Sequence, residues 1–171
     1  MLRFSRTLSN VGIYLVLILL TNIMIFSILL ISIKTLMDKS YEFLWKFGQW
    51  LQNNLDSSLT TIQNIGVLIL IGSLIAFAVL IFNLILVNSR KASLQRIGYI
   101  IGIIAGGFGL IISILPAIIF GSSNGDKLTM LVSLIFFLLM GLNNSLILTG
   151  SIFGMFFAKT LVDNYEKKSK S

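Results

Sequence analysis

Residues 57–89, SSLTTIQNIGVLILIGSLIAFAVLIFNLILVNS, contain no Asp, Glu, Lys or Arg. Three further charge-free stretches, each at least 27 residues long, occupy residues 7–33, 97–125 and 128–158. A helix needs roughly 20 apolar residues to cross the hydrocarbon core of a bilayer, which is about 30 Å thick. The sequence therefore predicts four membrane spans, at about residues 11–33, 63–87, 97–120 and 128–158.

The composition supports the same conclusion. Apolar residues make up 56% of the chain and charged residues only 11%, against about 25% charged in an average soluble domain. A soluble domain of this length has too much surface to be kept in water by so few charges. We predict an all-α fold, an integral membrane four-helix (tetraspan) bundle that forms a single transmembrane domain over residues 1–171.

Residue types that are absent exclude several kinds of chemistry. The sequence has no cysteine and no histidine, which excludes disulfides, thiol nucleophiles, Cys/His zinc sites and histidine acid–base catalysis. Coupled transporters usually keep an ionisable residue at membrane depth, and no span contains one. We therefore expect no catalytic residues, no cofactor and no metal ion, and we predict that the chain is not an enzyme.

The net charge of the segments outside the spans alternates along the chain between positive and zero. The two termini and the connection between spans two and three carry nine basic and two acidic residues, whereas the other two connections are neutral overall. Short basic segments are retained in the cytoplasm. We expect a plasma-membrane protein with both termini in the cytoplasm and a cytoplasmic basic tail at residues 159–171. This topology explains the net charge of +7 without any nucleic-acid partner.

The connection between the first two spans has helical periodicity. Apolar residues recur every three or four positions, so the sequence predicts an extracellular amphipathic helix at about residues 36–61. Such a helix either lies on the outer leaflet or packs on the ends of the spans. Four residues on or beside its apolar face are the candidate partner or interface surface: Trp45, Phe47, Trp50 and Leu51.

Small residues recur at four-residue intervals in the third and fourth spans. This spacing is typical of close helix packing in lipid, where association depends on close backbone approach. The spacing itself does not distinguish contacts within the chain, which we favour, from contacts in a homo-oligomer, which is the alternative. The candidate helix-packing residues are Gly98, Gly102, Gly106 and Gly109 in the third span and Gly150 and Gly154 in the fourth.

Asn143 and Asn144 form the most polar point within the spans. Amide side chains hydrogen-bond between helices in lipid, typically for about 0.6–2 kcal/mol. We expect these two residues to hold helices together, and a small polar site at this depth is the alternative.

The functional hypothesis from the sequence is a non-catalytic multi-pass membrane protein of bacterial origin, acting as an accessory or scaffold subunit of a membrane complex. It would act by helix packing and by protein–protein or protein–lipid contacts, so membrane lipid and another membrane protein, or further copies of this chain, are the expected partners. The alternative is an oligomeric pore or channel former of the holin kind, or a membrane toxin-immunity protein.

Overall fold

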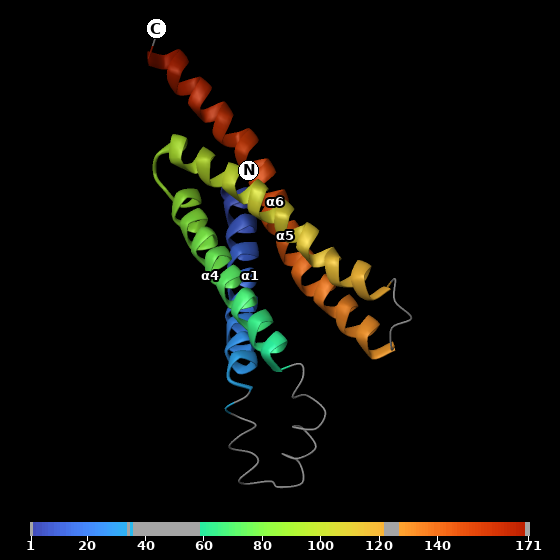
Figure 1. Cartoon of the computed structure of the whole chain (residues 1–171). Helices are drawn as coiled ribbons and strands as arrows, with labels where there is room; N and C mark the ends of the chain where they lie inside the picture. Colours follow the sequence, from blue (N-terminus) through green and yellow to red (C-terminus); the bar gives the residue numbers. More distant parts are fainter. Residues whose placement is uncertain (1, 34, 36–58, 122–126, 170–171) are drawn as a thin grey trace, which may run out of the picture. The chain divides into compact units, whose positions relative to one another are not determined.

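The computed structural model describes residues 2–33, 35, 59–121 and 127–169. Over these ranges the chain forms α-helices and no strand, as Figure 1 shows. The helices are α1 (Leu2–Ile31), α4 (Leu59–Val87), α5 (Ala92–Gly121) and α6 (Lys127–Ser169). A helix satisfies its backbone hydrogen bonds within one segment, which is what an apolar, lipid-embedded segment requires.

Each helix contains a segment long and apolar enough to span a membrane. These segments are Arg3–Ile31, Thr61–Val87, Ala92–Leu115 and Ser133–Ala158. The predicted all-helical tetraspan architecture is confirmed, and the chain is a multi-pass membrane protein.

All four helices begin before the predicted spans or end after them, and the difference is largest in α1 and α6. α1 begins at Leu2 rather than near residue 11, and α6 continues past Ala158 to Ser169, through most of the basic tail. Neither extension contains a glycine or a proline, so nothing in these segments stops a helix when the chain leaves the apolar region. The predicted amphipathic helix lies mostly outside the described residues, and its last three residues, 59–61, begin α4.

Side-chain burial is inverted relative to a water-soluble protein. The most exposed side chains include large hydrophobic residues such as Leu68, Ile104 and Phe156, each about two-thirds exposed or more. The fully buried set contains five serines: Ser5, Ser9, Ser27, Ser113 and Ser151. Apolar side chains that face outward and small polar ones that face neighbouring helices are the expected arrangement in lipid.

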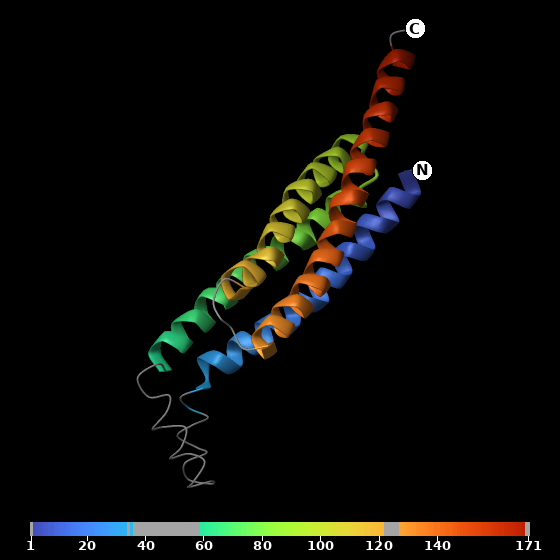
Figure 2. The same cartoon turned by 90° about the vertical axis from the view of Figure 1, so that its right-hand side faces the viewer.

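The helices divide into two compact units. The first comprises Met1–Leu19 and Ala78–Ser171, and the second comprises Leu20–Phe77. In the first unit α5 and α6 run side by side in opposite directions, and both views show them adjacent (Figures 1 and 2). A small apolar cluster joins three helices of this unit: Val87, Tyr99 and Ala158, with Met155 packed against them.

In the second unit, α1 and α4 approach closely at a glycine. A Cβ added at Gly66 would lie 3.0 Å from Leu30 Cβ and 3.2 Å from the carbonyl oxygen of Ser27. The Gln63 side chain donates a hydrogen bond to the carbonyl oxygen of Ile31, 3.1 Å away. This bond satisfies one of the carbonyls that the end of α1 leaves without an intrahelical donor.

The turn between α4 and α5 is held by its own side chains. Asn88 Nδ2 donates to the carbonyl oxygen of Leu84 at 2.8 Å, which caps the end of α4. Ser89 Oγ accepts from the backbone N–H of Lys91 at 3.3 Å, and the Gln95 side chain donates to the carbonyl oxygen of Ser89. These bonds order the short basic connection without an acidic residue.

Candidate functional site

Two glycines of α5 allow its backbone to contact α6. A Cβ at Gly106 would lie 3.0 Å from the backbone nitrogen of Leu148 and 3.1 Å from the carbonyl oxygen of Asn144. One turn further, a Cβ at Gly109 would overlap the side-chain amide of Asn144. A side chain at Gly106 would therefore press on the backbone of α6, and one at Gly109 would displace the Asn144 amide.

Two other glycines of the predicted set lie near the α4–α5 turn. One leaves space for an aromatic ring, and the other allows close approach of a neighbouring backbone. A Cβ at Gly154 would overlap the ring of Tyr99, whose Cδ1 would be only 2.6 Å away. A Cβ at Gly98 would lie 2.7 Å from the backbone nitrogen of Val87 and 2.9 Å from Leu86 Cβ. Gly98 thus contacts α4, although it belongs to the same ladder as glycines that contact α6.

The beginning of α1 packs on α6 through small residues. A Cβ at Gly150 would lie 2.5 Å from the backbone nitrogen of Ser9 and 3.1 Å from the carbonyl oxygen of Ser5. In turn, a Cβ at Gly12 of α1 would lie 2.8 Å from the backbone nitrogen of Ile147. Each helix therefore supplies a glycine to the other, and the two backbones touch.

The remaining predicted glycine, Gly102, lies beside a group of buried polar side chains that we name the central polar cluster: Ser9 of α1, Asn83 of α4 and Ser151 of α6. Ser9 Oγ and Ser151 Oγ are 3.4 Å apart. A Cβ at Gly102 would overlap Ser151 Oγ and would lie 3.2 Å from Asn83 Nδ2. The cluster brings polar groups of three helices to one glycine of the fourth.

Asn83 is the exceptional member of this cluster. Its side chain is fully buried, and neither its Oδ1 nor its Nδ2 has a hydrogen-bond partner among the described residues. A buried amide without partners destabilises a fold by about 1–3 kcal/mol. Asn83 is thus a buried amide whose hydrogen-bonding groups are unsatisfied among the described residues.

The two predicted polar residues of the fourth span have different surroundings. Asn144 is buried, and its Nδ2 donates to the carbonyl oxygen of Met140 at 2.8 Å, within its own helix. Its side chain also lies against Gly109 of α5. Asn143 is half-buried, and its carbonyl oxygen would lie 3.0 Å from a Cβ at Gly12. Both residues therefore lie at helix contacts, one through its side chain and one through its backbone.

An amide pair joins α1 to the α4–α5 turn. Asn10 Nδ2 donates to Asn88 Oδ1 at 3.0 Å, and Asn88 Nδ2 lies 3.3 Å from Asn10 Oδ1. The amides thus bond reciprocally, and Asn88 also caps α4. The Asn88 side chain thereby connects the end of α4 to a residue within α1.

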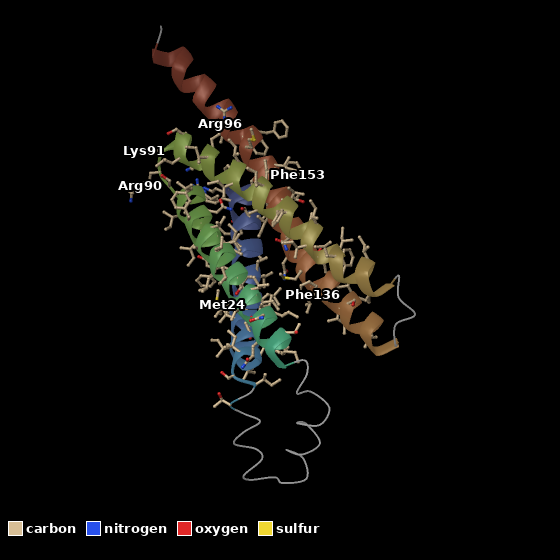
Figure 3. All side chains as sticks on the ribbon, in the orientation of Figure 1. Met24, Arg90, Lys91, Arg96, Phe136 and Phe153 are labelled. Atoms are coloured by element: carbon tan, nitrogen blue, oxygen red, sulfur yellow. The ribbon has the colours of Figure 1, made fainter. Side chains whose placement is uncertain are left out.

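Basic side chains gather at this same end of the first unit, and Figure 3 shows Arg90, Lys91 and Arg96 where α4 passes into α5. Arg90 and Lys91 are exposed, whereas Arg96 is half-buried. Arg6, also half-buried, lies close enough to the Tyr99 hydroxyl to interact with it electrostatically, but not in hydrogen-bonding geometry.

The predicted partner or interface surface falls outside the described residues. This applies to all four of its members: Trp45, Phe47, Trp50 and Leu51.

The groups that the structure brings together are hydroxyls, amides, guanidinium groups and one phenol. Within the described ranges no three His, Cys, Asp or Glu side chains group as metal ligands would. Hydroxyls and amides between helices form hydrogen bonds that favour helix association. The arrangement therefore suits helix packing and the binding of hydrogen-bond acceptors.

Several residues of these contacts were missed by the sequence analysis: Ser5, Ser9, Gly12, Tyr99 and Ser151. A signal for three of them was present, because Ser5, Ser9 and Gly12 continue the small-residue spacing at the beginning of α1, where Ser5 and Ser9 precede the predicted first span and Gly12 lies at its start. The sequence did not indicate that Tyr99 packs between helices, since an aromatic residue at the start of a span is also typical of the membrane interface.

Comparisons with protein-family models, with curated proteins and with solved structures found no match for this chain.

Proposed function

We propose that this chain is a non-catalytic subunit of the plasma membrane that acts as a scaffold or accessory component of a membrane complex. The observation that carries the proposal is the contact of Gly150 with Ser9, where two helix backbones touch. Contacts of this kind recur along α5 and α6, so the small residues are used within the chain. The large apolar side chains that remain face outward, toward lipid or a neighbouring subunit.

The proposal includes an orientation with both termini in the cytoplasm. Its support is the distribution of charge, since nine of the thirteen basic residues lie in the termini, in the α4–α5 connection and in the first turns of α5. Lys and Arg in short connections are retained on the cytoplasmic side.

Cysteine labelling tests the orientation directly, because the chain has no cysteine of its own. We expect a membrane-impermeant maleimide to label Ser123→Cys in intact cells and to label Ser171→Cys only after the membrane is permeabilised. Labelling of Ser171→Cys in intact cells would overturn the orientation.

Purification in mild detergent tests the scaffold role. We expect one membrane protein to co-purify in fixed stoichiometry and to be lost in the double variant Trp45→Ala/Trp50→Ala. The control Phe82→Ala alters an exposed side chain of α4 and should leave the partner in place.

Reconstitution separates this proposal from the pore-forming alternative. We expect proteoliposomes of the purified chain to hold an ion gradient as well as empty vesicles do. A chain-dependent ion leak would refute the scaffold proposal in favour of a pore.

A further inference from the structure

Three hydrogen-bond donors in the first unit lack an acceptor. Arg6 Nε, Arg96 Nε and the Tyr99 hydroxyl are all buried, and none has a hydrogen-bond partner among the described residues. The Tyr99 side chain is fully buried. We name these three residues the donor cluster.

The members of the donor cluster come from two helices, Arg6 from the first turns of α1 and the other two from the first turns of α5. Arg96 and Tyr99 are three residues apart on α5, so they share a face of that helix. Arg6 of α1 approaches the Tyr99 hydroxyl closely enough to interact electrostatically. Gly154 and Ala158 of α6 pack against Tyr99 and hold its ring in place.

The depth of the cluster matches the membrane surface. Arg6 lies within the first turn of the span Arg3–Ile31, and Arg96 lies within the first turns of the span Ala92–Leu115. Phospholipid phosphates occupy the corresponding layer of a bilayer. Basic pockets between spans at this level bind anionic lipid head groups.

Arg6 and Arg96 are half-buried side chains whose Nε atoms are buried, and a charged donor that is removed from solvent is stabilised by an anionic acceptor. Arg groups present planar, forked donors that match the oxygens of a phosphate, and the phenol adds a further donor. The exposed neighbours Arg3, Arg90 and Lys91 make the local field still more positive.

We propose that Arg6, Arg96 and Tyr99 form a binding site for a phosphate group, carried by an anionic phospholipid or present as free phosphate. The inference rests on the proposed function only in taking lipid as a partner, and it is independent of the orientation because phosphate lines both leaflets.

The test uses the purified full-length chain in a neutral detergent, with thermal unfolding as the readout. Three additions are compared: short-chain phosphatidylglycerol, short-chain phosphatidylcholine and inorganic phosphate. We expect a saturable rise in Tm with phosphatidylglycerol. An equal rise with inorganic phosphate alone would support the site and identify the free ion as a sufficient ligand, whereas no rise with any addition would overturn the proposal.

Matched variants identify the residues. Arg6→Gln and Arg96→Gln should each weaken the apparent affinity at least about tenfold, since one charge-assisted hydrogen bond contributes about 1.5–3 kcal/mol. Tyr99→Phe should weaken it by a smaller factor with no loss of basal Tm. The control Arg3→Gln removes the same charge from an exposed position one turn before Arg6 and should weaken the affinity much less than Arg6→Gln, because it removes only long-range attraction.

Two outcomes would overturn the site. An equal loss of affinity in Arg3→Gln and Arg6→Gln would mean diffuse attraction without a site. If Asp163→Asn lowered the basal Tm as much as Arg96→Gln, and neither variant altered the response to phosphatidylglycerol, Arg96 would be compensated by a carboxylate of the chain. Neither outcome changes the topology or partner experiments, so failure of this inference is distinguishable from failure of the proposed function.

Discussion

The ring of Tyr99 occupies the space that a side chain at Gly154 would need. Tyr99 is fully buried and is also held by Val87 and Ala158, so its ring has no free direction in which to move. This contact fixes the distance between α5 and α6 near the ends of their spans. At this position the Tyr99 ring of α5 fills the space that Gly154 of α6 leaves open.

The first prediction concerns this contact. Gly154→Ala should lower the stability of the chain by about 2 kcal/mol, because overpacking a filled interface typically costs 1–3 kcal/mol. Helix propensity alone would favour alanine by about 1 kcal/mol, so the sign of the change is informative. Unfolding in a mixed detergent titration measures it.

The control for this prediction is Gly107→Ala on α5. A Cβ at Gly107 meets nothing within 4 Å, so the substitution should be neutral or stabilising. In the background Tyr99→Ala, the cost of Gly154→Ala should largely disappear, because the ring is gone. If the two costs were instead additive, the ring contact would not be the cause.

The second prediction concerns the contact between α1 and α6. Gly150→Ala should destabilise more than Gly154→Ala, because its Cβ would meet the backbone of Ser9 at 2.5 Å and a backbone cannot change rotamer. The matched control is Gly141→Ala, where the nearest atom is the Ser113 hydroxyl at 3.4 Å. Equal stability of the two variants would contradict the backbone contact between α1 and α6.

How much of this arrangement could be predicted differs between the helices and their contacts. Charge-free stretches predict four spans because a bilayer imposes a minimum length and excludes charge. The extensions of α1 and α6 could not be found in that way, since helix continuation into the interface depends on local propensity and not on hydropathy. The four-residue spacing indicated which glycines share a face.

The spacing could not indicate which helix each glycine contacts. Gly98 contacts α4, Gly106 contacts α6, and Gly102 lies beside side chains of both. A ladder on a helix turns slowly around its axis, so successive members meet different neighbours. The sequence did not indicate the donor cluster for a related reason. Retention of basic segments in the cytoplasm already explained why arginines occur at positions 6 and 96, so these residues gave no further signal.

The third prediction concerns the reciprocal amide pair of Asn10 and Asn88. Hydrogen bonds between spans contribute about 0.6 kcal/mol on average, and this pair lies at an exposed position. In a double-mutant cycle with alanine at both positions, the free energy of unfolding of the detergent-solubilised chain is measured for each variant. We expect the coupling free energy between the two positions to be near that value. Asn88→Ala alone should cost more than Asn10→Ala, because Asn88 also caps α4 through the carbonyl oxygen of Leu84.

The cycle has a clear negative outcome. Additive effects of the two substitutions would mean that the amides do not stabilise each other in the membrane. The excess cost of Asn88→Ala would then belong to the cap alone.

The fourth prediction concerns Asn83, the fully buried amide without hydrogen-bond partners among the described residues. Replacing a polar group that makes no hydrogen bonds with an apolar group of similar size removes a desolvation penalty. Asn83→Leu should therefore leave the stability of the detergent-solubilised chain unchanged or raise it. Asn144→Leu is the contrasting variant, because the Asn144 amide donates to Met140 and fits against Gly109, so this substitution should destabilise.

A marked loss of stability in Asn83→Leu would refute this account, because it would mean that the amide has an acceptor or donor in the membrane. The central polar cluster predicts where such a partner would have to lie, between Asn83 and the paired hydroxyls of Ser9 and Ser151. In that case Ser151→Ala should be destabilising in the native background and neutral in the Asn83→Leu background, since a shared partner couples the two sites. Additive behaviour would place the partner of Asn83 elsewhere.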